Sequence, residues 1–166
     1  AAFSVLRAHP HHLAYFNELA GGPARGHRWF VDSNLDWGQG LKELGERLRE
    51  RGSPTIFLSY FGVADPSYYG IRYHPVGFVS NVERRDGVAA PEAGKALWLA
   101  VSATNLHGVY YRDKKAFSWL ESRKPAFVVG HSIFVYELGA DLDARRRLAG
   151  IVEGEGAREL ARRLIQ

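Results

Sequence analysis

Cysteine is absent from the 166-residue chain, so neither a disulfide nor a thiolate metal site can form. No apolar run approaches the roughly 18 residues that a membrane-spanning helix needs. The glycine motifs that cradle phosphates or dinucleotides are missing, and so is the nucleophile-elbow motif of hydrolases. We therefore predict a chain that contains no complete catalytic site, no metal centre and no cofactor.

A surplus of one charge is also lacking, because 22 basic residues face 18 acidic ones and the net charge is only +4. No basic stripe alternates with aromatic residues, which argues against nucleic acid as a partner. Acids separate the late arginines, as is typical of solvated helix faces, while attraction to anionic lipid headgroups is the alternative. These arginines are Arg145, Arg146, Arg147, Arg158, Arg162 and Arg163.

The composition that is present suits one globular domain with a real core, since 46% of the residues are apolar. The start has neither an initiator Met nor a signal-peptide pattern, so we expect a piece of a longer protein. We predict an N-terminal amphipathic helix or linker over residues 1–24, an α/β domain over 25–140 and an Arg-rich helical tail over 141–166.

Hydrophobic periodicity predicts the elements of that α/β domain. Strands are expected at 27–34, 55–62 and 96–110, and 125–138 forms either a hairpin or one bent strand. Helices are expected at 10–20, at 37–52 with a leucine stripe and a closing glycine, at 113–123, and twice in the tail around Gly154 and Gly156. This alternation predicts a layered mixed sheet, largely parallel with an antiparallel edge, covered by helices.

The string VDSNLDWGQG at 31–40 stands where a predicted strand passes into a helix. Ligands of open α/β sheets bind at the carboxyl ends of strands, so its carboxylates could bond sugar hydroxyls while Trp37 stacks on a sugar ring. The alternative is a helix cap with ordinary turn chemistry. Calcium is a further alternative, since an EF-hand-like order of ligands occurs, although Trp37 replaces the required glycine. Those ligands are Asp32, Asn34, Asp36 and Glu43.

Polar residues also follow the next two predicted strands, so the three strand ends could converge on one ligand-binding rim. Independent caps and turns are the alternative. The candidate rim comprises Asp32, Asn34, Asp36, Trp37, Gln39, Tyr60, Asp65, Tyr68, Asn105 and His107. Carboxylates and amides would bond hydroxyls, and Trp37 and Tyr60 would supply stacking faces.

The histidines point less clearly to chemistry. His9, His11 and His12 have poor spacing for metal ligands, and His107 and His131 lie in apolar strands as expected of core residues. A hydrolase that uses Ser132 with a histidine and an acid stays open as a minor hypothesis.

Several strings occur together in a fixed order: HPHHLAYFNELAGGP, DSNLDWGQGLKEL, YFGVADPSYYGI, AVSATNLHGVY and GHSIFVYEL. As a set, over residues 9 to 138, they resemble the soluble C-terminal region of bacterial membrane glycosyltransferases of the family 39 type, which are related to protein O-mannosyltransferases. Gly40 departs from the acidic residue that the resemblance implies there, and the tail after 140 has no counterpart.

The resemblance implies an accessory domain on the extracytoplasmic face of the bacterial inner membrane, attached to a transmembrane part of the same polypeptide. Such enzymes move a sugar from a polyprenyl-phosphate carrier, and their catalytic acid lies between membrane helices, so no catalytic residue transfers to this chain. The domain would help to bind a glycan acceptor or the carrier, close to the membrane surface. The competing hypothesis is a purely structural or protein-interaction module without a ligand site.

Overall fold

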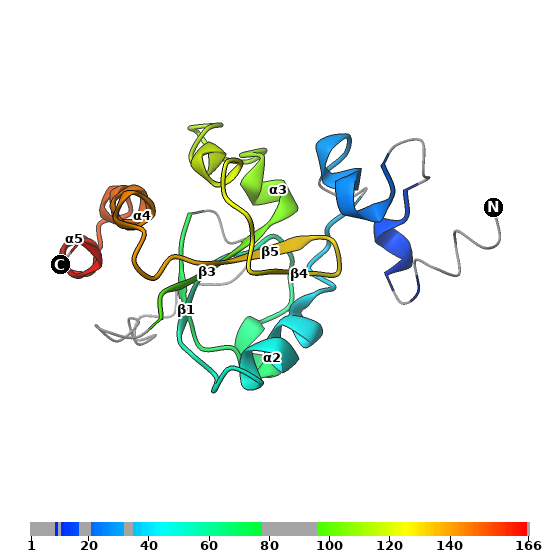
Figure 1. Ribbon diagram of the computed structural model, residues 1–166, viewed down its shortest axis with the longest axis horizontal. Coiled ribbons are helices and arrows are strands. Elements are labelled where there is room, and N and C mark those ends of the chain that lie inside the picture. The colour runs from blue at the N-terminus through cyan, green and yellow to red at the C-terminus, as the bar shows by residue number, and fades with distance from the viewer. Residues whose placement is uncertain (1–8, 10, 17–20, 32–34, 78–95, 166) are drawn as a thin grey trace.

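Five strands form one mixed sheet in the computed structural model, which describes residues 9, 11–16, 21–31, 35–77 and 96–165 (Figure 1). The order across the sheet is β2-β1-β3-β5-β4. The strands are β1 (Ile56–Ser59), β2 (Tyr73–Pro75), β3 (Trp98–Ser102), β4 (Phe127–Val129) and β5 (Ile133–Glu137).

The strand directions confirm the predicted mixed sheet. β1 pairs in parallel with β2 on one side and β3 on the other, whereas β5 runs antiparallel to both β3 and β4. β5 is therefore the reversed strand among the described strands. The carboxyl ends of β1 and β3 lie next to each other, which is the geometry on which a shared site at that edge depends.

The segment 125–138 is a hairpin rather than one bent strand. Gly130 and His131 both have positive φ, +55° and +58°, and Ser132 N donates to Val129 O at 3.0 Å. Positive φ values are typical of the tight turns that join antiparallel strands, and three residues separate the paired Val129 and Ile133 here. Glycine accepts this conformation readily, while His131 holds it as an unusual non-glycine residue.

Alternating side chains build a separate apolar cluster on each face of the sheet. Ile56 and Leu58 of β1 pack with α2 (Leu41–Arg49), whereas Phe57 packs on the other face with α4 (Leu142–Gly154) and α5 (Arg158–Leu164). Both faces of β1 are consequently buried, as is typical of a parallel strand. Figure 1 shows α2 on one side of the sheet and α3 (Ala103–Leu106) on the other.

Helix α2 follows its predicted pattern closely. Its stripe of Leu41, Leu44 and Leu48 is buried, and Gly52 has the positive φ, +78°, that ends the helical region. Ser53 N then donates to Leu48 O at 2.9 Å. The two helices predicted in the tail are also present, with the break at Glu155–Ala157. They pack on the sheet through Leu148, Val152 and Leu164, so the tail shares the main core.

The strand predicted at 27–34 is wrong for its described residues. Residues 23–28 form a 3-10 helix, η3 (Pro23–Arg28), and Trp29 and Phe30 after it are 66% and 55% exposed. Phe30 stacks on Phe16 at 5.9 Å instead of entering the sheet. A run of three apolar residues does not distinguish a strand from the end of a helical turn, which is why periodicity failed here.

Two predicted helices are much shorter than expected. The segment 10–20 contains only η1 (His12–Ala14) among its described residues, because Tyr15 is extended; Leu13 is exposed and Ala14 is buried in its place. The segment 113–123 contains only η6 (Ser118–Leu120). No helix of the described residues is long and apolar enough to cross a membrane.

Candidate functional site

The described part of the VDSNLDWGQG string forms a tight turn with a buried carboxylate. Asp36 is fully buried, and its Oδ1 accepts a hydrogen bond from Gly38 N at 3.2 Å. Gly38 has φ +77°, and Tyr60 Oη donates to Gly38 O at 3.4 Å. A Cβ at position 38 would overlap the Tyr60 ring, so this close approach requires glycine. Burial and the nearby Asp36 carboxylate raise the pKa of Tyr60 above its usual range, so it stays a neutral donor.

The Gln39 side chain bonds the backbone of this turn, whereas the Trp37 side chain is exposed. Gln39 Oε1 accepts from Trp37 N at 2.8 Å and its Nε2 donates to Leu35 O at 2.9 Å, so the amide holds the turn together. The Trp37 side chain is 56% exposed and presents a ring to solvent. Tyr60 is fully buried and offers no such face, which makes its predicted stacking role wrong.

The carboxyl ends of β1 and β3 do converge, but they form a buried polar cluster rather than an open rim. Ser59 Oγ accepts from Asn105 Nδ2 at 3.0 Å and lies 2.7 Å from Tyr111 Oη. Ser102 Oγ accepts from Phe61 N at 3.0 Å. Ser59, Ser102 and Asn105 are fully buried. Polar groups taken out of water must bond one another, so these hold the strand ends in place.

Two of the remaining predicted rim residues, Asp65 and Tyr68, make local contacts. Asp65 caps η5 (Pro66–Tyr69) by accepting from Ser67 N at 2.9 Å, and Tyr68 is exposed with its ring edge against Tyr69. His107 contacts His27 of the N-terminal segment. Asp32 and Asn34 lie outside the described residues.

The calcium interpretation gains no support from the part of the chain that the structure describes. Within it, no group of three or more histidine and acidic side chains is arranged to hold a metal ion. Glu43, the expected last ligand, pairs instead with His11, at 3.3 Å between Oε2 and Nε2.

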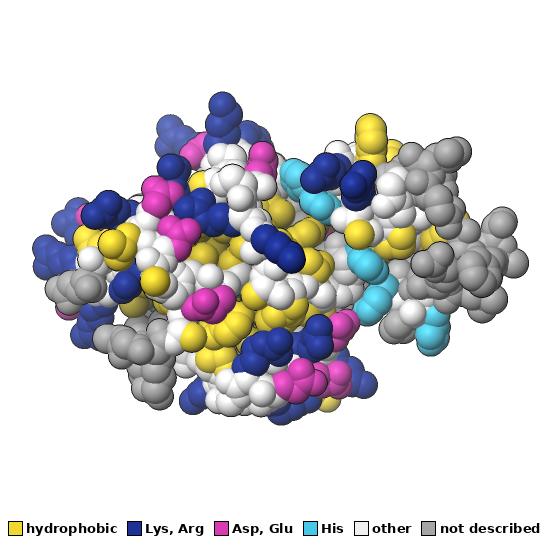
Figure 2. Space-filling view, viewed as in Figure 1, with side chains coloured by type: hydrophobic (Ala, Val, Ile, Leu, Met, Phe, Trp, Pro, Cys, Tyr) yellow, Lys and Arg dark blue, Asp and Glu magenta, His cyan; other side chains and the backbone are white. Residues whose placement is uncertain are grey.

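Histidine contacts connect the N-terminal segment to the sheet, and Figure 2 shows histidine side chains gathered between these two parts. His11 lies edge-on to His131 at 5.9 Å, and His27 Nδ1 lies 3.2 Å from His107 Nε2. Burial, followed by the charges of His107 and Arg28, lowers the pKa of His27 to about 4. Burial also lowers the pKa of His107 and of His131. These imidazoles are therefore neutral near pH 7.

The hydrolase hypothesis needs a histidine at Ser132, and the structure provides none. Ser132 is fully buried, and its Oγ has no hydrogen-bond partner among the described residues. A nucleophile requires a base within hydrogen-bond reach and access for a substrate. Ser132 meets neither requirement.

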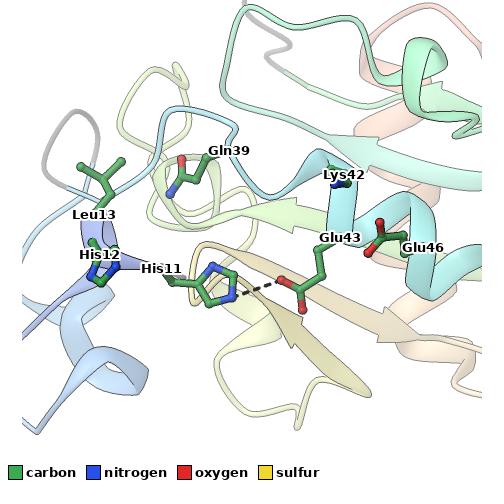
Figure 3. Close-up of a pocket in the computed structure, with 7 residues that line it drawn as sticks. All are labelled: His11, His12, Leu13, Gln39, Lys42, Glu43 and Glu46. Carbon is green, nitrogen blue, oxygen red and sulfur yellow. Dashed lines mark ion pairs between the residues drawn. The ribbon is translucent and has the colours of Figure 1, made fainter. Parts of the chain in front are cut away.

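An open cavity of about 730 Å³ lies beside the turn, between η1 and α2 (Figure 3). Its lining carries both signs of charge and one amide: His11, His12, Leu13, Gln39, Lys42, Glu43 and Glu46. Figure 3 shows the His11–Glu43 pair joining its two walls. The volume falls in the range of small-molecule sites. This cavity is the candidate functional site.

Of the predicted rim residues that the structure describes, only Gln39 lines the cavity. The sequence singled out His11 and His12, and Glu43 only as a calcium ligand. Lys42 and Glu46 were not expected to line a site, because they lie on the charged face of an amphipathic helix. The sequence did contain one indication of this site. His9, His11 and His12 lie close together, and α2, later in the chain, has a polar face with charges of both signs.

No protein-family model, no curated protein and no solved structure matches the chain. The resemblance to membrane glycosyltransferases therefore stays an expectation drawn from the sequence strings. Function is argued below from the geometry of the site.

Proposed function

We propose that this chain is the extracytoplasmic accessory domain of a membrane-embedded glycosyltransferase that uses a polyprenyl-phosphate sugar, and that the cavity between η1 and α2 binds a neutral glycan. The proposal carries over the resemblance of the five ordered strings. The observation that supports glycan binding is the mixed polar lining of the open cavity, to which Gln39 contributes from the turn that carries the exposed Trp37.

The lining suits hydroxyl groups better than a strongly charged ligand. Glu43 and Glu46 offer acceptors, Lys42 and the imidazole of His12 offer donors, and the two acids outnumber the one lysine. This excess of negative charge would repel a phosphate, whereas a hydroxyl both donates and accepts. Trp37, two residues before Gln39, supplies an exposed ring of the kind that stacks on sugars.

Calorimetric titration of the chain with neutral oligosaccharides tests this part of the proposal. We expect weak binding that falls about tenfold or more in the double variant Lys42→Ala/Glu46→Ala, because two hydrogen-bonding groups are lost. Glu50→Ala is the matched control, since Glu50 ends the same helix, pairs with Arg51 and does not line the cavity. Equal affinity in both variants would place the glycan elsewhere.

The transferase assignment needs a separate assay with a longer polypeptide that carries this segment. Sugar transfer from a polyprenyl-phosphate donor is expected from that polypeptide and not from the 166-residue chain alone. In the longer protein, Lys42→Ala/Glu46→Ala is expected to raise the KM for the acceptor with little change in kcat. Transfer by the isolated chain would contradict an accessory role.

A structural module without a ligand is the second candidate, favoured by the buried polar cluster. Asp36, Gln39 and Asn105 bond within the protein, so packing alone accounts for these parts of the predicted rim. Absence of heat with every glycan, together with wild-type stability of the Lys42→Ala/Glu46→Ala variant, would favour this candidate.

A further inference from the structure

A second cavity, of about 970 Å³, lies between the segment 110–119 and helix α4, drawn lime and orange in Figure 1. Among the described residues, it shares no lining residue with the cavity of Figure 3 and none with the predicted rim. Tyr110, Trp119 and Ile151 form part of its apolar lining, and Arg112 and Lys115 contribute positive charge. The volume is at the upper end of the range for small-molecule sites.

Among the described lining residues of this cleft, Arg112 and Lys115 are less engaged than the acids, whereas Arg147 pairs with Asp143 at 2.9 Å. Asp113 Oδ1 accepts from Lys115 N at 2.9 Å, and the Glu155 carboxylate accepts from Gly77 N. Neither Arg112 nor Lys115 forms an ion pair with an acid of the described residues. Donors of Arg112 and Lys115 are therefore available to an oxyanion, which a planar guanidinium recognises well.

The aromatic part of the lining is held in place by its own contacts. The Tyr110 ring stacks on Phe61 at 5.5 Å with an interplanar angle of 5°, and it remains 48% exposed. Trp119 Nε1 donates to Ala116 O at 2.9 Å, so the polar edge of the indole is already satisfied. Tyr110 thus offers exposed apolar surface to a ligand, whereas Trp119, which is only 8% exposed, contributes a small part of the lining.

Two glycines keep the α4 wall of the cleft open. Gly150 lies in the helix interior and Gly154 one turn later, and a Cβ at either position would meet no atom within 4 Å. Glycine is unfavourable inside a helix, and packing does not require it here. A larger side chain at these positions would occupy the cleft, which provides a direct way to block it.

We propose that this cleft binds an amphipathic anion, with its oxyanion head at Arg112 and Lys115 and its apolar body against Tyr110 and the glycine face of α4. The site is distinct from the glycan cavity, and the proposal does not depend on the transferase assignment. Inorganic phosphate has the oxyanion group but no apolar chain, and a neutral alkyl glycoside has the apolar chain but no oxyanion. Neither should bind as well as a molecule with both.

Titration calorimetry with n-octyl phosphate, below its micelle concentration, tests this directly. We expect n-octyl phosphate to bind at least tenfold more tightly than either inorganic phosphate or n-octyl glucoside. Octanoate is a further arm that separates phosphate from carboxylate ligands, and binding of either oxyanion supports the proposal. Equal affinity for n-octyl glucoside would overturn it, because the cations would then play no part.

Two variants locate the binding. Arg112→Ala/Lys115→Ala should weaken n-octyl phosphate binding at least tenfold, whereas Arg162→Ala/Arg163→Ala on α5 removes the same charge outside the cleft and should not. Gly150→Leu should abolish binding while the melting temperature stays the same or rises, because leucine favours helix and its Cβ would meet no atom within 4 Å. Undiminished binding in Gly150→Leu would overturn the proposal.

Discussion

The polar residues on the two sides of the turn at 35–40 differ in what they bond. Behind the turn, Ser59, Asn105 and Tyr111 bond one another in the buried polar cluster. In front of it, Lys42 and Glu46 line an open cavity. Polar groups sealed from water must satisfy one another, while those on the wet face of a helix remain available to a ligand. Burial, rather than residue type, therefore separates architecture from a binding surface here.

The largest effect is expected where the turn meets the buried side. Gly38→Ala should destabilise the fold by about 3 kcal/mol, because the new Cβ overlaps Tyr60 and alanine is strained at φ +77°. Gly52→Ala is the matched control, since φ is +78° there with no atom within 4 Å, and it should cost only about 1 kcal/mol. Urea unfolding measures both. Equal costs would mean that Tyr60 does not press on the turn.

A smaller loss of stability is expected from the buried polar cluster itself. Ser59→Ala removes a bond to Asn105 and one to Tyr111, which should cost about 2 kcal/mol in the free energy of unfolding. Ser118→Ala, which removes an exposed hydroxyl bonded to Lys115 O, is the control and should change stability by less than about 0.5 kcal/mol. Glycan affinity should be unchanged in both variants. A loss of affinity in Ser59→Ala alone would tie the cluster to the site.

Acid should weaken the junction between the N-terminal segment and the sheet. The pKa of His27 is lowered to about 4 in the folded protein and is near 6.5 when unfolded. Between those values the unfolded chain binds more protons, so stability is complete above about pH 7 and falls as the pH drops from 6.5 towards 4. Allowing for the partial exposure of His27, the loss is about 1 kcal/mol.

Urea midpoints at pH 7.5, 5.5 and 4.5 measure this loss. His27→Gln keeps a hydrogen-bonding side chain without titrating, so its stability should depend less on pH than that of the wild type. The pKa values of His107 and His131 are also lowered, so part of the dependence of stability on pH should remain in His27→Gln. An unchanged slope in His27→Gln would show that His27 is already solvated.

The smallest effect on stability is expected at Trp37. Because its side chain is 56% exposed, Trp37→Ala should change the free energy of unfolding by about 0.5 kcal/mol or less. Its effect on glycan affinity sharpens the contrast between the two sides of the turn. A loss of about tenfold would extend the site from the cavity onto the ring, as expected of a stacked aromatic residue, whereas no change would confine it to the cavity.

Regular patterns were predicted correctly where one burial rule applies along a whole element. The leucine stripe of α2 and the glycine after it follow directly from helical geometry, and so do the two tail helices. The short apolar run before Asp32 was interpreted wrongly because Trp29 and Phe30 are exposed beside a 3-10 helix. Local hydrophobicity does not report whether the sheet has a place for another strand.

The candidate site was only partly predictable for the same reason. The sequence indicated that polar residues follow β1 and β3, and parallel pairing of these strands brings Ser59 and Asn105 together. It did not indicate that Tyr111 would also bond Ser59, or that Ser59 and Asn105 would be fully buried. The cavity also joins His11 to Glu43, 32 positions apart in the chain, and no local pattern connects those positions.

By itself, the sequence determined the mixed α/β class and the elements with a sustained pattern, α2 and the two tail helices, because side-chain periodicity and glycine conformations act over a few residues. The strand predicted at 96–110 is shorter, since β3 ends at Ser102 and α3 follows it. The sequence also determined that no thiol chemistry is available. Only the tertiary structure decided which polar residues are sealed into the buried cluster and which line the two cavities. Burial depends on contacts between distant segments, and these contacts set whether a carboxylate or amide bonds the protein or stays open to a ligand.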